Sequence, residues 1–86
     1  MSEKVPEYQV IRILRWYQKK GDSLIGEIPL LDINVDDIRK LFSECDQNPL
    51  YDSYCVKDQH IDFLQHFIEE KIDLDVFDYF VECDAI

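Results

Sequence analysis

Residues 58–86 constrain the fold most, because they are strongly acidic and also rich in large apolar side chains. The segment holds nine aspartates and glutamates against one base, Lys71. Disordered acidic tails lack large apolar residues, whereas this segment has twelve leucine, isoleucine, valine and phenylalanine side chains. We therefore expect it to fold, with its carboxylates on the surface and its apolar groups in a core.

Helical periodicity divides this segment into two amphipathic halves. From Asp58 to about residue 70, apolar residues recur every three to four positions, opposite a side that carries Asp62 and Glu69. Ile72 and Asp73 then have the order of a hydrophobic staple and an N-cap, which favours a further helix over 74–83. A strand over 74–83 stays open, because its apolar residues also alternate. On the helix, one polar side would hold Asp75, Asp78, Tyr79 and Glu82.

The N-terminal part predicts a β-hairpin. Residues 7–18 are dense in β-branched and aromatic side chains, residues 19–22 have turn chemistry, and residues 23–31 form a second extended run. A helix over 7–18 is the alternative, with Pro6 in its first turn and Gly21 as its cap. Gly26 indicates a bulge or a close approach, and Pro29 indicates a sheet edge.

Asn34 begins the clearest helix, because its side chain can accept hydrogen bonds from the free amides of the first turn. We expect this helix to end near Asp46, ahead of Pro49. The following connection ends in a short extended piece, a candidate third strand. The whole chain, 1–86, then reads as a single α+β domain, in which an N-terminal antiparallel β-hairpin packs against about three helices.

The charge of the chain limits its partners. The formal net charge is −10, which disfavours direct binding of nucleic acid or of anionic lipid and favours a basic protein. The imbalance lies in residues 21–86, which carry −13, whereas residues 1–20 carry +3. The basic segment can simply complement acidic neighbours within the fold.

Metal-binding and catalytic patterns are absent from the sequence. The three cysteines include no Cys-x-x-Cys pair, and His60 and His66 are too far apart in sequence for one helical face. We expect no metal, no cofactor and no enzymatic activity, with His60 in the core, His66 solvated and the thiols small and mostly buried. No signal peptide or membrane-spanning run is evident, so we expect a cytoplasmic protein.

A partner-binding surface is therefore expected on the acidic segment, with Tyr79 as the first aromatic anchor among its carboxylates. An ordinary solvated helix face is the alternative for each of these acids. Two tyrosines flanking an aspartate before the candidate third strand could also bind, or could pack against the core edge. The predicted partner-binding residues are Tyr51, Asp52, Tyr54, Asp62, Glu69, Asp75, Asp78, Tyr79 and Glu82.

Three segments carry a resemblance to a known group of proteins: 16–30, 48–54 and 78–83. They resemble small acidic bacterial proteins encoded beside polymorphic-toxin and contact-dependent growth inhibition loci. The resemblance implies an immunity protein, a cytosolic inhibitor that binds the C-terminal toxin domain of a secreted or surface effector. By analogy that toxin is a basic nuclease. An adaptor for a basic cellular protein and a DNA-mimicking inhibitor are the other binding functions compatible with the charge.

Overall fold

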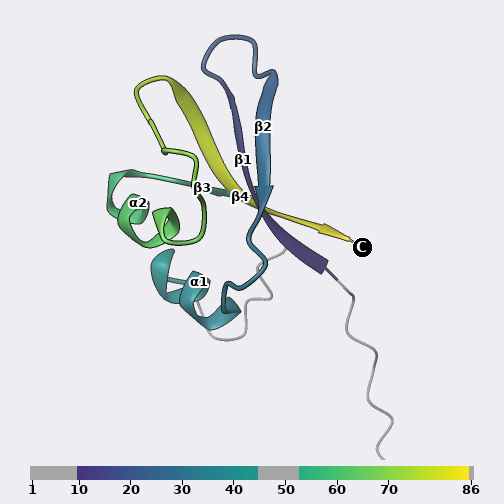
Figure 1. The fold of residues 1–86 in the computed structure, drawn as a ribbon, viewed down its shortest axis with the longest axis vertical. Coiled ribbons are helices and arrows are strands. Elements are labelled where there is room, and N and C mark those ends of the chain that lie inside the picture. The colour runs from purple at the N-terminus through teal and green to yellow at the C-terminus, as the bar shows by residue number, and fades with distance from the viewer. Residues whose placement is uncertain (1–9, 45–52, 86) are drawn as a thin grey trace, which may run out of the picture.

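The computed structural model describes residues 10–44 and 53–85, with the side chain of Ala85 excepted. Four strands and two helices follow one another in the order β1, β2, α1, β3, α2 and β4 (Figure 1). Their bounds are β1 Val10–Gln18, β2 Leu24–Pro29, α1 Val35–Leu41, β3 Tyr54–Cys55, α2 Asp58–Gln65 and β4 Phe77–Ala85. The α+β class is confirmed, with two helices in the described residues rather than about three.

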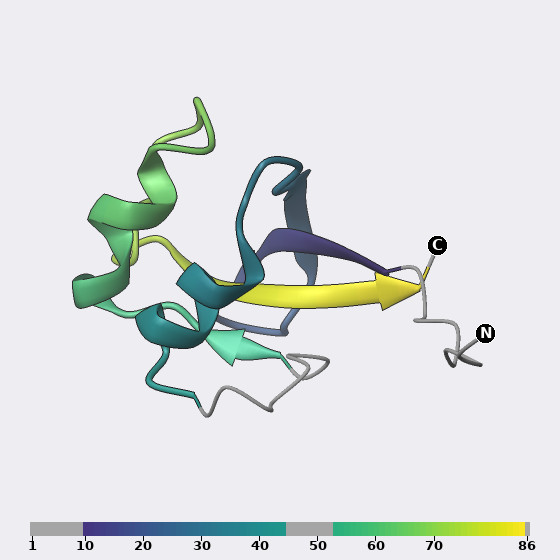
Figure 2. The same cartoon turned by 90° about the horizontal axis from the view of Figure 1, so that it is seen from below.

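One antiparallel sheet has the strand order β2-β1-β4-β3. The first and last strands are therefore neighbours at its centre, and they pair along nine residues from Val10 opposite Ala85 to Gln18 opposite Phe77. Figure 2 shows β4, in yellow, running the length of the sheet with α1 and α2 toward one end of it. The sheet thus depends on contacts between residues far apart in the chain.

The predicted hairpin is confirmed as β1 and β2. Its turn is closed by a hydrogen bond from the Gln18 N–H to the Ser23 carbonyl at 2.9 Å, and Gly21 has a φ of +86°. Ile25 is an extra residue in β2, because Trp16 pairs with Gly26 whereas the next residue of β1 pairs with Leu24. Both expectations for Gly26 are met, since the Trp16 ring also lies against it.

The helix favoured over 74–83 is wrong, and the alternative of a strand is correct. A turn at 74–76 leads directly into β4, which pairs with β1 along its whole length. Tyr79 and Val81 alternate into the core, while Asp78 and Glu82 point to the other side of the sheet. Pairing with β1 gives the side chains on both faces of β4 cross-strand neighbours. An isolated amphipathic helix would bury only one of its faces.

The first helix begins as expected and ends early. The Asn34 side chain accepts a hydrogen bond from the Asp36 N–H at 2.8 Å, which confirms it as the N-cap. The end near Asp46 is wrong, because Ser43 takes a φ of +57° just after the helix. The Ser43 N–H bonds to the Lys40 carbonyl and the next N–H bonds to the Arg39 carbonyl, the pattern of a Schellman motif.

The second helix is also shorter than the predicted 58–70. It ends at Gln65, whose side chain stabilises the following turn through three hydrogen bonds. The Gln65 amide donates to the carbonyls of Ile68 and Glu70, and its oxygen accepts from the Ile72 N–H at 3.0 Å. This amide replaces the backbone bonds that a longer helix would have made.

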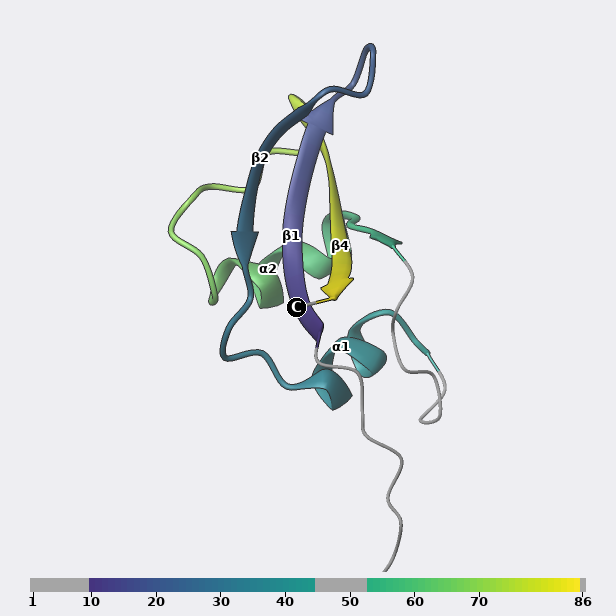
Figure 3. The same ribbon diagram turned by 90° about the vertical axis from the view of Figure 1, so that its right-hand side faces the viewer.

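The core lies between the helices and one face of the sheet. Eight buried residues form a continuous apolar cluster: Leu14, Leu30, Val56, Leu64, Ile68, Ile72, Tyr79 and Val81. Figure 3 looks onto the opposite face, with the strands in front and both helices behind them. Neither described helix therefore covers that opposite face. Neither of them is long and apolar enough to cross a membrane.

Candidate protein-binding surface

The side of the sheet opposite the two described helices gathers a set of mostly charged and aromatic side chains from β1, β2 and β4 and from residues next to β1 and β3. Residues that pair across antiparallel strands share a side, and hydrogen bonds between these side chains confirm the grouping. We call this set the outer face. It consists of Ile13, Arg15, Tyr17, Lys19, Glu27, Ser53, Asp78, Phe80, Glu82 and Asp84.

Arg15 is the centre of the outer face. Its guanidinium donates to Glu27 on β2 at 2.7 Å and to Glu82 on β4 at 3.0 Å. It also binds both carboxylate oxygens of Asp84, with Nη1 to Oδ1 at 3.0 Å. The Arg15 side chain is only 17 % exposed, so one partly buried cation holds three carboxylates from two neighbouring strands.

The electrostatic effects of this arrangement have clear directions. Hydrogen bonds to Asp84, Glu27 and Glu82 raise the pKa of the Arg15 guanidinium, so Arg15 stays charged. The bond from Arg15 in turn lowers the pKa of the Asp84 carboxyl. Both shifts favour the ionised forms of Arg15 and Asp84, so this pair is charged at neutral pH.

Tyr17 extends the network toward the turn end of the sheet. Its hydroxyl donates to the Glu82 carboxylate at 2.9 Å, and its ring meets Phe80 edge-on with centroids 5.7 Å apart. Burial first, and the bond to Glu82 second, raise the pKa of the Tyr17 phenol. On its other oxygen Glu82 accepts from the Ser53 hydroxyl at 3.1 Å. Glu82 therefore joins β1, β4 and the segment before β3.

The outer face keeps a net negative charge. Lys19 pairs with Asp78 at 2.9 Å, but both side chains are more than 40 % exposed, so this pair is weak. Within the face, four carboxylates stand against two cations. The half-buried rings of Tyr17 and Phe80 lie among these charges. An acidic surface with embedded aromatic groups can bind a basic protein.

Three of the predicted binding residues lie on or beside this surface. Asp78 and Glu82 belong to the outer face. Asp75 is exposed in the turn before β4 and lines a neighbouring pocket. The structure thus brings these three acids near one another, although on a strand and its preceding turn rather than along a helix.

The expectation that Tyr79 is an exposed anchor is wrong. Tyr79 is 3 % exposed, and its ring packs against Trp16 in the core with centroids 5.5 Å apart. Its hydroxyl accepts from the Asp73 N–H at 3.1 Å and points toward the Lys71 carbonyl. Because β4 is a strand, residue 79 faces the opposite side from its neighbours Asp78 and Phe80.

The remaining predicted residues are dispersed. Tyr54 is half-buried on the core side of β3, where its ring packs against Phe42 with centroids 5.3 Å apart. Asp62 is exposed on α2 and Glu69 is exposed after it, away from the outer face. Tyr51 and Asp52 lie outside the described residues.

The histidine expectations are confirmed. His60 is 5 % exposed and accepts a hydrogen bond from the Lys57 N–H at 2.9 Å, while His66 is exposed. Burial, and then the nearby Lys57, lower the pKa of the His60 imidazole. Within residues 10–44 and 53–85, no group of three histidine, cysteine, aspartate or glutamate side chains could hold a metal.

The thiol expectation is partly wrong. Cys55 and Cys83 are free cysteines, but Cys55 is exposed and Cys83 is only partly buried. Cys55 lies on the edge strand β3 opposite Phe80, where neither helix covers it. Cys45 lies outside the described residues.

Sequence reasoning missed the central residue of the surface, Arg15. Arg15 lies on β1 between Ile13 and Tyr17, which share its side of the strand. The available signal was the alternation of 77–83, which would have put Glu82 and Asp78 on the same side as each other. Nothing local could have paired that strand with β1, and so with Arg15.

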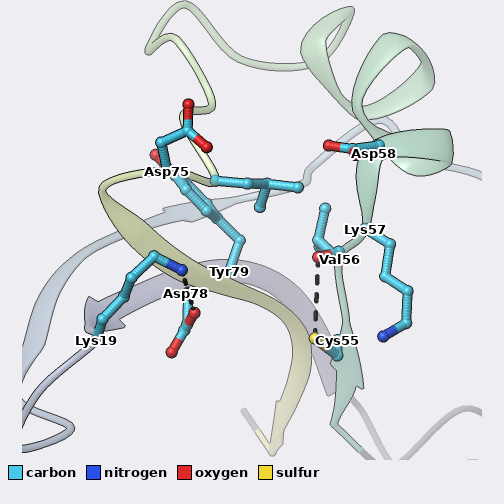
Figure 4. A pocket seen from close by; sticks show the side chains of 9 residues that line it. Lys19, Cys55, Val56, Lys57, Asp58, Asp75, Asp78 and Tyr79 are labelled. Carbon is cyan, nitrogen blue, oxygen red and sulfur yellow. Dashed lines mark hydrogen bonds and ion pairs between the residues drawn. The ribbon is translucent and has the colours of Figure 1, made fainter.

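A small pocket lies beside the outer face, between the start of β4 and the junction of β3 with α2. Its volume is about 320 Å³, and Val56, Leu74 and Tyr79 contribute its apolar lining. Figure 4 shows Asp58 and Asp75 approaching from opposite sides, with the side chain of Lys57 directed away from both. Asp78 belongs to both the pocket and the outer face.

The profile of a family described as a domain of unknown function (DUF7683) matches residues 11–82, which include every element from β1 to most of β4. No curated protein matches the chain.

Proposed function

The chain belongs to the DUF7683 family of domains of unknown function, and we propose that it is an immunity protein that binds and neutralises the C-terminal toxin domain of a bacterial contact-dependent or secreted effector. The toxin domain is a cationic protein, and a nuclease fits best by its need to bind phosphates. The immunity protein acts in the cytoplasm, where Cys55 and Cys83 stay reduced.

The observation that carries the proposal is the outer face. Arg15 alone offsets Glu27, Glu82 and Asp84, so two negative charges remain around a single guanidinium. The hydrogen bonds from Arg15 hold these carboxylates in place before any partner binds, which lowers the entropic cost of binding. A strong net charge of −10 on the whole chain adds long-range attraction for a cation-rich surface.

The mechanism follows from the requirements of a nuclease. Such an enzyme presents lysines and arginines to phosphates, and a rigid acidic surface can cover the same groups and block access to them. Charge attraction raises the association rate toward about 10⁸ M⁻¹s⁻¹ at low salt. The rings of Tyr17 and Phe80, once desolvated by the partner, then slow dissociation.

The direct test is co-expression with the C-terminal domain of a large secreted effector encoded next to this gene. We expect the full chain to restore growth and to form a one-to-one complex with that domain, but not with the toxin domain of an unrelated effector. Growth that stays arrested despite soluble expression of both proteins would refute the proposal. A complex with a housekeeping basic protein, and no linked toxin, would support an adaptor instead.

Placement of the interface needs matched charge variants. Asp78→Asn combined with Glu82→Gln removes two charges from the outer face and should slow association and flatten its salt dependence. Asp62→Asn combined with Glu69→Gln removes the same charge from exposed sites elsewhere and should change the association rate far less. An equal effect of the two pairs would mean that net charge, rather than this face, guides binding.

A further inference from the structure

The pocket beside the outer face has walls that are fixed before any ligand binds. The Val56 N–H donates to the Tyr79 carbonyl at 2.9 Å, which joins the end of β3 to β4. On the opposite wall, the turn carrying Asp75 is held by its own N–H, which donates to the Asp73 carboxylate at 3.0 Å. The pocket is therefore part of the folded framework.

Its two rim carboxylates have no cation of their own. Asp58 and Asp75 are exposed and face the gap from α2 and from the turn before β4 (Figure 4), and neither takes part in an ion pair within the described residues. Lys19 also lines the pocket, but its ammonium group is bound to Asp78. Lys57 extends away from the two rim carboxylates (Figure 4).

The size and lining of the pocket select the kind of group that fits. A volume of about 320 Å³ lies at the lower end of the range for ligand sites, so the pocket suits one side chain rather than a cofactor. Leu74, Val56 and Tyr79 give the pocket its apolar lining. The carboxylates of Asp58 and Asp75 lie above Val56 and Tyr79 in Figure 4. Lysine and arginine have this amphipathic form, an aliphatic stem with a cationic end.

We propose that this pocket receives one lysine or arginine side chain of the protein that covers the outer face, an inference that rests on the proposed function. The stem lies on Leu74 and Val56, and the cationic head lies between Asp58 and Asp75. Asp78, shared by the pocket and the outer face, makes the two surfaces continuous. The pocket thus adds one specific side-chain contact to the general attraction between the acidic outer face and a basic partner.

The test uses the full chain and small probes. N-acetyl-arginine amide and N-acetyl-lysine amide are titrated into the ¹⁵N-labelled protein, and amide shifts are followed by NMR. We expect saturable shifts at Val56, Leu74 and Asp75, with none from N-acetyl-glutamate amide and weaker ones from the uncharged N-acetyl-norleucine amide. Shifts spread evenly over the acidic residues, or no saturation at these three amides, would overturn the proposal.

Charge variants make the test specific. Asp58→Asn and Asp75→Asn should each weaken binding of the arginine probe about two- to five-fold, the range expected for an exposed ion pair. Asp62→Asn is the matched control, because it removes an exposed charge from α2 outside the pocket. An equal loss in this control variant would contradict a specific site.

The two proposals fail separately. If the probe binds but the co-expressed toxin still arrests growth, the pocket stands and the immunity function falls. The opposite outcome is a toxin complex that forms while the Asp58→Asn, Asp75→Asn double variant changes neither the dissociation rate of that complex nor the affinity for the probe. In that case the pocket proposal falls and the function stands.

Discussion

The indole of Trp16 lies so close to Gly26 in the adjacent strand that a methyl group at residue 26 would overlap ring atoms Cζ2 and Cε2. Trp16 and Gly26 are paired across β1 and β2, directly beside the bulge at Ile25. On its other side the same indole packs against Tyr79. One glycine therefore allows a large ring to connect the hairpin with β4.

Gly26→Ala should destabilise the protein by about 1–3 kcal/mol, because the added methyl must displace the Trp16 ring. Chemical denaturation of the two proteins measures this difference. In a Trp16→Leu background the ring is absent, so the same Gly26→Ala change should cost much less. An equal cost in both backgrounds would mean that the backbone, rather than the ring, requires glycine.

Arg15→Met should lower the free energy of unfolding by about 1.5–3 kcal/mol, the range for hydrogen bonds to charged groups. The reason is that Glu27, Glu82 and Asp84 would then repel one another without their shared cation. Lys19→Met is the matched control, since its pair with Asp78 is exposed and should contribute less than about 1 kcal/mol. Similar losses from both variants would contradict a central role for Arg15.

Local sequence pattern predicted the hairpin, the cap at Asn34 and the burial of His60, because each depends on residues close in the chain. It could not decide residues 74–83. Val76, Phe77, Phe80 and Val81 have helical spacing, while Phe77, Tyr79 and Val81 also alternate. The deciding contribution is pairing with β1, which comes from the other end of the chain and leaves no local signal.

The candidate surface was predicted in part for the same reason. The composition predicted an acidic surface, and Asp78 and Glu82 do lie together on the outer face. Arg15 and Glu27 joined them only through the registers of β1 with β4 and of β1 with β2. The misplacement of Tyr79 followed from the helix, since a strand turns alternate residues to opposite sides.

His60 should make stability depend on pH between neutral and mildly acid conditions. Burial lowers the pKa of its imidazole below the usual 6.5, so the unfolded chain binds the proton more readily than the folded protein. Stability should then fall as the pH drops below 6.5, toward the lower pKa of the folded state. His60→Gln should show a smaller fall in urea midpoint between pH 7 and pH 5, and an identical fall would contradict this.

Asp84 should contribute to stability only while it is ionised. The bond from Arg15 lowers its pKa below the ordinary 3.8, so its contribution is present above that value and is lost as the pH falls through the folded pKa. Asp84→Asn should therefore be less stable than the parent at pH 7, with the two melting temperatures converging toward pH 2. A gap that stays constant over this range would exclude the ion pair as its cause.

Tyr79→Phe should cost about 0.5–1.5 kcal/mol, because the Asp73 N–H loses its acceptor within the part-buried turn. The variant should bind the partner at the parent's association and dissociation rates, since it keeps the ring that lines the pocket and loses only a hydroxyl that bonds within the protein. Phe80→Ala should instead speed dissociation, because Phe80 lies on the outer face. Rate constants from surface plasmon resonance distinguish the two, and a faster off-rate for Tyr79→Phe would place the interface differently.

The central position of β1 has a consequence for synthesis on the ribosome. β1 and β2 emerge before β4, so one flank of β1 must wait for the last strand of the domain. Until then the nascent hairpin has exposed apolar residues on one side and unsatisfied hydrogen-bonding groups along its free edge, the condition in which chains associate wrongly. The domain can reach its native state only once β4 has also left the ribosome, and removal of β4 would leave the early hairpin without its partner strand.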